Sequence, residues 1–309
     1  MDIYLRKILD DNKHLFGTIK NIKKINKGFT NLLYIVNNKF VIKICFNKEN
    51  EENFKNEINF YKFNGNNSYM PKLYAYFISS SKNDYSYEIL EKIDGYTIYH
   101  IWHTLSEKQR KEIIKELVSL MKLFHTHRKT VLDWSNYFID KLKVNFHKCY
   151  QLNLFSLKEK SKLEFILNHI SPYLNSYDFC LVHADIHFDN LFLTKNNKLK
   201  IIDFETSLYA PMDYELDIFL RMCRNPWKYA SEEDEQFIKI EDYKNIKKYL
   251  KEFYPDIFLI NHFNIRSKIY DLEYNLRLLS KFPNDLKLKK DIKDIINKLF
   301  LKLQKRTVN

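Results

Sequence analysis

At 309 residues and a formal charge of +12, the chain is long enough to bury a large core and basic enough to raise the question of a nucleic-acid partner. The excess of positive charge comes mostly from lysines that are scattered along expected helical faces. This distribution favours a solvated basic surface, so we expect no nucleic-acid binding. No apolar run approaches the about 18 residues that cross a bilayer, and the four cysteines lack metal-type spacing, so we expect a cytoplasmic protein without a membrane span.

The first part of the chain has the composition of a β-sheet. Runs rich in β-branched and aromatic residues alternate with polar turns, which predicts five strands. These predicted strands are Ile19–Ile25, Leu32–Val36, Phe40–Cys45, Lys72–Ile78 and Ser86–Leu90. The intervening segment Lys48–Asn64 carries apolar residues at helical spacing and predicts one helix.

A two-residue turn at Asn37-Asn38 is predicted to join the second and third strands, because asparagine tolerates positive φ. This register places Leu32 opposite Lys43. Lys43 would then lie beside the turn Gly28–Asn31, which contains one of only four glycines in the chain.

Lys43 lies within an otherwise apolar strand, where an ammonium group is costly unless it has an acidic partner. Val41 would share its face of the strand. We expect Glu57, on the following helix, to be the partner, with Glu52 as the alternative. The other interpretation is an edge strand whose lysine points to water.

The segment Glu91–Gly95 is predicted to cross from the strands to a helix-rich remainder. A helix begins at Ser106, where Gln109 completes a capping box. The remainder is helical except for Phe179–Phe204. The predicted order is therefore strands with one helix, followed by helices with one embedded hairpin.

The embedded hairpin is the most informative part of the sequence. Two apolar runs flank Lys195–Lys198, and a two-residue turn at Asn196-Asn197 would place Asn190 directly opposite Asp203. Cross-strand β-carbons lie roughly 4.5–5.5 Å apart. An amide oxygen and a carboxylate this close are suitable ligands for Mg²⁺.

Asp185 precedes Asn190 by five residues, on the loop that enters this hairpin. There it could accept a proton from an attacking hydroxyl group. His183 is better suited to holding the loop in place. The alternative is a surface hairpin with polar ends, but the combined order His-x-Asp-x-x-x-x-Asn, strand, turn, strand, Asp-Phe favours a functional site.

These motifs resemble those of a known family. His183-Ala184-Asp185, Asn190 and Ile202-Asp203-Phe204-Glu205 are similar to the catalytic and metal motifs of the aminoglycoside phosphotransferase and choline kinase family, which is related to the protein kinases. Ala184 replaces the commoner glycine. Glu205 stands where protein kinases have glycine, which favours a small-molecule kinase over a protein kinase.

The resemblance implies an α+β fold of the two-lobed, protein-kinase-like type. Residues 1–93 would form a nucleotide-binding lobe with a small antiparallel sheet and one helix. Residues 94–309 would form a larger, mainly helical lobe with the catalytic loop, the metal site and the acceptor site.

The resemblance also implies roles for individual residues. Asp185 would be the catalytic base, Asn190 and Asp203 the Mg²⁺ ligands, and His183 and Asp217 the structural supports of the catalytic loop. The cofactor-binding residues, for ATP or GTP, would be Gly28, Thr30, Val41, Lys43, Glu57 and the backbone of Glu91 and Ile93.

Ser231–Glu235 and Glu241-Asp242 form an acidic cluster in this basic chain, which suggests a cationic acceptor such as an aminoglycoside or an amino alcohol. Glu205, Glu241 and Asp242 are the candidate contacts. The alternative is a solvated helix start. The predicted activity is nucleotide-dependent O-phosphorylation of a small molecule by a monomer or dimer, in the manner of an antibiotic-modifying enzyme. A choline/ethanolamine or homoserine kinase, and a noncatalytic nucleotide-binding scaffold, remain alternatives.

Overall fold

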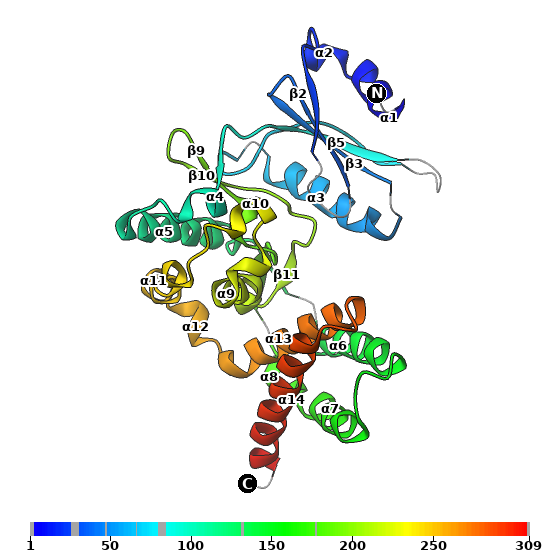
Figure 1. Ribbon diagram of the computed structural model, residues 1–309, viewed down its shortest axis with the longest axis vertical. Helices are drawn as coiled ribbons and strands as arrows, with labels where there is room; N and C mark the ends of the chain where they lie inside the picture. Colours follow the sequence, from blue (N-terminus) through cyan, green and yellow to red (C-terminus); the bar gives the residue numbers. More distant parts are fainter. Residues whose placement is uncertain are drawn as a thin grey trace. The chain divides into compact units, whose positions relative to one another are not determined.

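The computed structural model describes residues 3–25, 31–46, 48–65, 67–79, 85–130, 133–176 and 178–307, which Figure 1 traces from blue to red. The chain groups into two compact units. The first contains Met1–Leu117, Asp185–Ser207 and Pro226–Asp242, and the second contains Val118–Ala184, Leu208–Asn225 and Tyr243–Asn309. Within the described ranges, no helix combines the length and the apolar character needed to cross a membrane.

The first unit combines the N-terminal sheet with the embedded hairpin. Its elements are α1 (Ile3–Asp11), α2 (Lys13–Phe16), β1 (Ile22–Ile25), β2 (Leu32–Val36), β3 (Phe40–Cys45), the 3-10 helix η1 (Lys48–Asn50), α3 (Glu51–Asn64), β4 (Leu73–Phe77), β5 (Ser86–Glu91), β6 (Gly95–Thr97), α4 (Ile98–Trp102), η2 (Phe188–Asn190), β9 (Leu191–Thr194), β10 (Leu199–Ile201), η4 (Pro226–Lys228), α10 (Glu232–Glu235) and η5 (Ile240–Tyr243). Helix α5 (Glu107–Phe124) begins in this unit and ends in the second.

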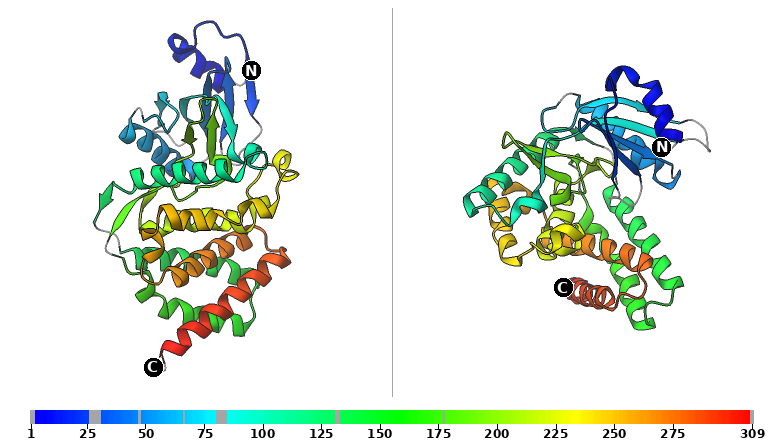
Figure 2. Two further views of the ribbon diagram at one scale, coloured as in Figure 1. Left: turned by 90° about the vertical axis from the view of Figure 1, so that its left-hand side faces the viewer. Right: turned by 45° about the horizontal axis from the view of Figure 1, so that its top comes forward.

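The second unit is mainly helical. Its elements are β7 (Arg128–Lys129), α6 (Trp134–Gln151), α7 (Leu157–His169), α8 (Ser171–Leu174), β8 (Phe179–Val182), β11 (Leu208–Ala210), η3 (Met212–Glu215), α9 (Leu216–Arg224), α11 (Ile246–Phe253), α12 (Asp256–Leu259), α13 (Phe263–Lys281) and α14 (Leu286–Thr307). Figure 2 shows these helices from two further directions.

The sheet of the first unit has five antiparallel strands in the order β1-β2-β3-β5-β4. Successive side chains of strand β3 point alternately to the two faces of the sheet, and other elements cover both faces. Phe40, Ile42 and Ile44 are buried against α1 and α2, which lie over one face of the sheet (Figure 1). Val41 and Lys43 therefore point to the opposite face, which α3 covers.

A second, three-stranded sheet of the first unit has the order β10-β9-β6. Gly95 of β6 pairs with Thr194 of β9. A β-carbon added to Gly95 would lie 2.3 Å from the carbonyl oxygen of Leu193. No side chain fits at this distance, so the close approach of the two backbones requires glycine here.

The second unit has its own sheet, in the order β11-β8-β7, and one large apolar core. Helix α13 packs against both α6 and α14 and supplies much of that core. A buried ion pair also stabilises it. Arg266 Nε lies 2.6 Å from Asp213 Oδ2 and Arg266 Nη2 lies 2.9 Å from Asp213 Oδ1, and both side chains are almost fully buried.

The five predicted strands, the helix between the third and fourth of them and the β9–β10 hairpin occur in the predicted order, with β2 and β3 at their predicted bounds. The prediction that the remainder is helical outside Phe179–Phe204 is wrong, since the short strands β6, β7 and β11 also occur there. The capping box is also confirmed, since the Ser106 N–H donates to Gln109 Oε1 (2.9 Å) and the Gln109 N–H donates to Ser106 Oγ (3.4 Å). Strand β1 is shorter than predicted, and helices α1 and α2 were not predicted. The lobe boundary at residue 93 stays a prediction, since the compact units group the chain differently.

Gly95→Ala should destabilise the protein, because the added methyl group forces β6 and β9 apart. We expect a loss of at least about 2 kcal/mol in the free energy of unfolding, measured by urea denaturation. Tyr96→Ala in the same strand is the control, because the Tyr96 side chain is more than half exposed, and it should cost less than about 1 kcal/mol. Equal losses would contradict the steric explanation.

Candidate active site

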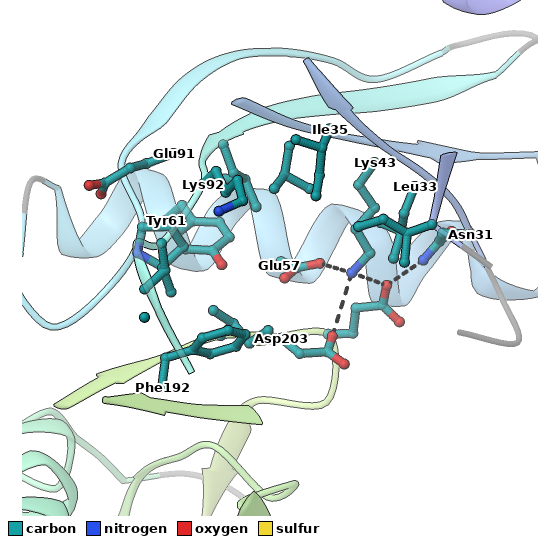
Figure 3. A pocket seen from close by; sticks show the side chains of 18 residues that line it. Asn31, Leu33, Ile35, Lys43, Glu57, Tyr61, Glu91, Lys92, Phe192 and Asp203 are labelled. Carbon is teal, nitrogen blue, oxygen red and sulfur yellow. Dashed lines mark hydrogen bonds and ion pairs between the residues drawn. The ribbon is translucent and has the colours of Figure 1, made fainter. Parts of the chain in front are cut away.

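A cavity of about 410 Å³ lies in the first unit, between the five-stranded sheet, α3 and the β9–β10 hairpin (Figure 3). Its lining combines apolar side chains with a group of charges. The apolar lining includes Ile35, Val41, Leu90, Ile93 and Phe192, and the charged lining includes Lys43, Glu57, Asp203 and Glu205. This combination suits a ligand with a flat apolar part and an anionic part.

Lys43 is the only cation drawn among the dashed contacts of Figure 3, and three carboxylates surround it. Its Nζ lies 2.5 Å from Glu57 Oε2, 2.7 Å from Glu205 Oε1 and 3.5 Å from Asp203 Oδ1. Burial alone would lower the pKa of Lys43, but these three negative charges raise it well above its ordinary value. The ammonium group therefore stays charged in the cavity.

Glu57 is the buried partner of Lys43, and the alternative Glu52 instead contacts Lys55 (3.2 Å). The second carboxylate oxygen of Glu57 accepts the backbone N–H of Phe204 (3.3 Å). Burial raises the pKa of Glu57 to about 7, against the attraction of Lys43. Glu57 thus links β3, α3 and the segment that follows β10.

Phe204 holds the Asp203-Phe204-Glu205 segment against α3. Its ring stacks on Phe60, with centroids 3.9 Å apart, and meets the edge of Tyr61 at 5.4 Å. The side-chain amide of Asn56 donates to the carbonyl oxygens of Glu205 (3.1 Å) and Ser207 (2.7 Å). The backbone on both sides of Phe204 is therefore held by one helix.

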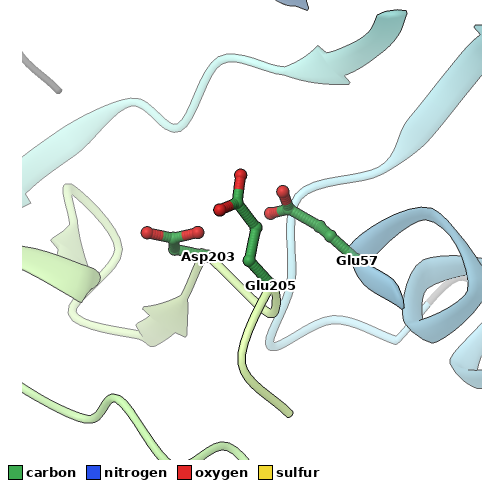
Figure 4. A group of neighbouring side chains, drawn as sticks. All are labelled: Glu57, Asp203 and Glu205. Carbon is green, nitrogen blue, oxygen red and sulfur yellow. The ribbon is translucent and has the colours of Figure 1, made fainter. Parts of the chain in front are cut away.

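Asp203 has φ of +67°, a left-handed conformation that aspartate tolerates better than most residues. Together with Glu57 and Glu205 it forms a group of three carboxylates whose nearest oxygens lie within 4.8 Å of one another (Figure 4). Asn31 donates to Glu205 Oε1 at 2.7 Å, which connects the start of β2 to this group.

Asp185 and Asn190 lie on the loop that leads into β9. The side-chain amide N–H₂ of Asn190 donates to the backbone carbonyl oxygen of Asp185 (3.0 Å), and the backbone carbonyl oxygen of Asn190 accepts the N–H of Ile202 (3.0 Å). Asp185 is partly exposed, and its Oδ2 lies 3.8 Å from His187 Nε2. The base proposed for this loop is therefore accessible and has an imidazole beside it.

The predicted register of the β9–β10 hairpin is wrong by one residue. Leu191 pairs with Ile201, so Asn190 lies opposite Ile202 instead of Asp203. The turn is longer than predicted, because the Asn197 N–H donates to the Thr194 carbonyl (2.9 Å) and Asn197 adopts a φ of +55°. One additional residue in the turn shifts every later pair.

The predicted register of the β2–β3 hairpin is also wrong by one residue. Asn37 and Asn38 both have positive φ, as predicted for this turn, but Leu33 and not Leu32 lies opposite Lys43. Lys39 donates its N–H to the Val36 carbonyl (3.0 Å) without entering the strand pairing. This extra residue accounts for the shift.

The oxygen donors present fit a magnesium ion. Glu57 already accepts from Lys43 and Phe204, which leaves Asp203 and Glu205 as the carboxylates suited to a cation. The amide of Asn190 directs its N–H₂ group toward Asp185, so its oxygen is turned away from that residue. Carboxylate and amide oxygens are the ligands that Mg²⁺ prefers.

In the second unit, Glu215 holds the backbone of His183 and Ala184, which directly precede Asp185 in the sequence. Its carboxylate accepts the His183 N–H at 3.0 Å and the Ala184 N–H at 3.1 Å, and His125 Nε2 lies 3.2 Å away. Burial alone would raise the pKa of Glu215, but these hydrogen bonds and the positive potential of His125 lower it below its ordinary value.

The resemblance assigned the support of this loop to Asp217, and the structure shows Glu215 at the two amides instead. The carboxylate of Asp217 pairs with Arg221, one turn further along α9. Ala184 has φ of +63°, a position where glycine would avoid the strain of a β-carbon. The commoner glycine at this place in the motif thus has a conformational reason.

The remaining predicted residues fall in different places. Val41, Glu91 and Ile93 line the cavity, whereas Gly28 and Thr30 lie outside the described residues. Glu91 donates its N–H to the Lys72 carbonyl (2.8 Å), and its carboxylate accepts from Lys200 (2.8 Å). This ion pair connects the end of β5 to β10.

The acceptor candidates also separate. Glu205 faces Lys43 inside the cavity. The carboxylate of Asp242 lies 2.7 Å from Arg110 Nη1, and its carbonyl oxygen accepts from Trp102 Nε1 (3.1 Å). Asp242 therefore already has structural partners, while the side chain of Glu241 is exposed.

Sequence reasoning missed Asn31, Tyr61 and Glu88, which lie within or beside this charged group. Asn31 ends the predicted glycine turn and gave no separate signal. Glu88 could have been found by the argument used for Lys43, since it is the one charged residue between Ser86 and Leu90 in an otherwise uncharged strand.

The fold is that of the protein-kinase-like phosphotransferases. The chain is similar to the ADP-bound aminoglycoside phosphotransferase APH(2'')-Ib, with a TM-score of 0.69, 19% identity and coverage of 97% of this chain and 99% of that one. The chain is also similar to the gentamicin complex of APH(2")-IIa, with a TM-score of 0.68, 18% identity and coverage of 97% of this chain and 98% of that one. For the GDP complex of aminoglycoside 2'-phosphotransferase-IIIa, the TM-score is 0.62 and the identity 13%, and the similarity covers 97% of this chain and 98% of that one. These similarities confirm the predicted fold.

The phosphotransferase enzyme family model matches residues 21–242, and the chain belongs to this family. Serine/threonine-protein kinase Nek9 of Xenopus laevis is 27% identical over 123 residues. That match spans 36% of this chain and only 13% of the Nek9 protein. The family match supports a phosphotransferase enzyme of the kinase type.

Glu215→Gln should destabilise the protein by about 2 kcal/mol at neutral pH, because the buried carboxylate accepts charge-assisted hydrogen bonds. A lowered pKa means that this contribution is present above the ordinary carboxyl pKa and is lost as the pH falls through the lower, folded-state value. The difference from wild type in urea denaturation should shrink on acidification. Exposed Glu164→Gln is the control and should show no such trend.

Proposed function

We propose that the protein transfers the γ-phosphoryl group of ATP or GTP to a hydroxyl group of a small cationic molecule, in the manner of an aminoglycoside-modifying enzyme. The observation that carries this proposal is the buried Lys43–Glu57 ion pair in the wall of a cavity that also contains Asp203. An ammonium group held by one carboxylate can offer its remaining N–H groups to phosphate oxygens. The solved structures to which the chain is similar include ADP and GDP complexes.

The apolar lining of the cavity would hold the purine ring. Val41 and Leu90 come from neighbouring strands, β3 and β5, and are direct cross-strand partners. The backbone of Glu91 and Ile93 would hydrogen-bond the edge of the base. Since the Glu91 N–H already donates to Lys72, its carbonyl oxygen is the group we assign to this contact.

Asn190, Asp203 and Glu205 would hold Mg²⁺ with the nucleotide. When bound, the ion would neutralise charge on the phosphates. Glu205 contacts Lys43 at 2.7 Å, so its carboxylate lies beside the group that we assign to the phosphates. Glu205 therefore belongs with the nucleotide site in this proposal, and not with the acceptor.

Asp185 would act as the base that orients and deprotonates the acceptor hydroxyl. This role is supported by the partial exposure of the Asp185 side chain and by the position of Asp185 beside Asn190. The reaction needs no covalent intermediate, because positioning of the hydroxyl and stabilisation of phosphate charge supply the catalysis.

Asp185→Asn should lower kcat by at least about 100-fold, because the amide cannot accept the hydroxyl proton. The nucleotide Kd should stay within about threefold of wild type, since Asp185 is not a phosphate or metal contact in this proposal. Steady-state kinetics and calorimetry measure the two quantities. Asp140→Asn, an exposed carboxylate on α6, is the control. An unchanged kcat in Asp185→Asn would refute the assignment of the base.

The cationic acceptor is proposed from the family and from the acidic surface of α10 and η5. Asp234 is buried and contacts His100 (3.0 Å), whereas Glu232, Glu235 and Glu241 are exposed. Exposed carboxylates of this kind would attract a polyamine-like antibiotic.

Aminoglycosides should therefore be phosphorylated in preference to choline, ethanolamine or homoserine when nucleotide consumption is measured across the four classes. Glu241→Lys should raise the KM for the accepted aminoglycoside about three- to tenfold, through repulsion of like charges. Its KM for nucleotide should not change. Preference for homoserine, which carries no net charge at neutral pH, or an unchanged acceptor KM in Glu241→Lys, would contradict the cationic class.

A further inference from the structure

Glu88 is a buried carboxyl group that the proposed reaction does not use. It lies in β5, is 0% exposed, and pairs directly with Lys43 across the β3–β5 ladder. Directly paired residues project to the same face of a sheet. Glu88 therefore lies beneath α3, on the same side as Lys43 and the cavity.

Neither carboxylate oxygen of Glu88 has a donor among the described residues, and the buried hydroxyl group of Tyr61 has no partner in that same set. A buried carboxylate without a donor is strongly destabilising. The same group is tolerated when it carries a proton, because a neutral carboxylic acid loses less hydration and becomes a donor itself.

The charges around Glu88 favour the protonated form. Burial raises the pKa of Glu88 well above its ordinary value, and the neighbouring Glu57 acts in the same direction, through its negative charge and as an acceptor for a proton held by Glu88. Lys43 opposes this effect, but that one ammonium already faces three other carboxylates. Burial also keeps Tyr61 protonated by raising its pKa.

The groups that face Glu88 come from every element packed against it. Lys43 lies on β3, Glu57 and Tyr61 on α3, and Tyr76 is its direct partner on β4. Glu205 adds a further negative charge from the segment after β10. Of the two acids, Glu57 accepts from an ammonium and a backbone N–H, whereas Glu88 has neither. The proton therefore belongs on Glu88.

We propose that Glu88 is a protonated positioning residue, which donates a hydrogen bond to Glu57 and so orients that carboxylate toward the phosphate-binding Lys43. Glu57 then receives donors from three elements: Lys43 of β3, Glu88 of β5 and the backbone of Phe204. This inference rests on the proposed function only for the role of Lys43, since the proton on Glu88 is a property of the protein without ligand.

The first experiment detects the proton without using activity. Infrared spectra of protein with ¹³C-labelled glutamate, compared with unlabelled protein at about pH 8, where most of Glu57 with its pKa of about 7 is ionised, should contain the C=O band of a protonated glutamic acid. The band should disappear in Glu88→Gln and persist in Glu57→Gln. Glu52→Gln, which removes a highly exposed carboxylate, is the matched control and should keep it. Absence of the band in wild type, or its persistence in Glu88→Gln, overturns the proposal.

The second experiment tests the positioning role by nucleotide affinity. Glu88→Gln retains an N–H donor toward Glu57 and should bind nucleotide within about threefold of wild type, whereas Glu88→Leu lacks any donor and should bind about tenfold or more weakly. The KM for acceptor should not change in either variant. Equal affinities in the two variants, with both folded by circular dichroism, overturn the proposal.

The third experiment uses the pH dependence of stability. A raised folded-state pKa means that the native protein binds the proton more tightly, so stability falls as the pH rises above the ordinary carboxyl pKa. Glu88→Gln removes this effect, and its stability relative to wild type should rise from about pH 5 to about pH 8. A difference that is flat with pH overturns the proposal.

Wild-type protein that shows the infrared band but no phosphotransfer would refute the proposed function and leave the proton assignment intact.

Discussion

The candidate site depends on one desolvated ammonium group. Lys43 is almost buried in β3, and an ammonium in that environment is tolerated only when carboxylates compensate for the hydration that it has lost. Glu57 does so at 2.5 Å and Glu205 at 2.7 Å. Because these partners come from α3 and from the segment after β10, a single charge connects three separate segments of the first unit.

Helix α3 organises most of what surrounds that charge. It contributes Glu57 to the ion pair, Phe60 to the stack on Phe204, and Asn56 to the carbonyl oxygens that follow Asp203. The left-handed backbone of Asp203 is strained for a residue with a side chain, and strain of this kind persists only where neighbouring contacts hold it. The packing of Phe204 and the hydrogen bonds from Asn56 are those contacts.

The second unit shows a related arrangement on a smaller scale. Glu215 is fully buried, yet its carboxylate is ionised because two backbone amides and His125 direct donors at it. Glu88 in the first unit is equally buried but has no such donors. The contrast illustrates that the protonation state of a buried acid follows from its hydrogen-bond partners more than from burial itself.

Much of the fold and site could be predicted from the sequence because the signals were local. The alternation of apolar residues in Phe40–Cys45, the capping box at Ser106 and the order of polar residues from His183 to Glu205 each depend on neighbours in the chain. The need of a buried lysine for an acid also led directly to Glu57. These inferences require only that local geometry and desolvation act in the usual way.

Tertiary structure alone decided the register of both hairpins, since one extra residue in each turn moved every pair by one position. It also decided that Glu215 holds the amides before Asp185, and that Glu88 lies against the Lys43–Glu57 pair. Turn length and the approach of side chains from distant elements depend on how the whole backbone packs. A periodic sequence pattern indicates which face a residue occupies, but not which residue it meets there.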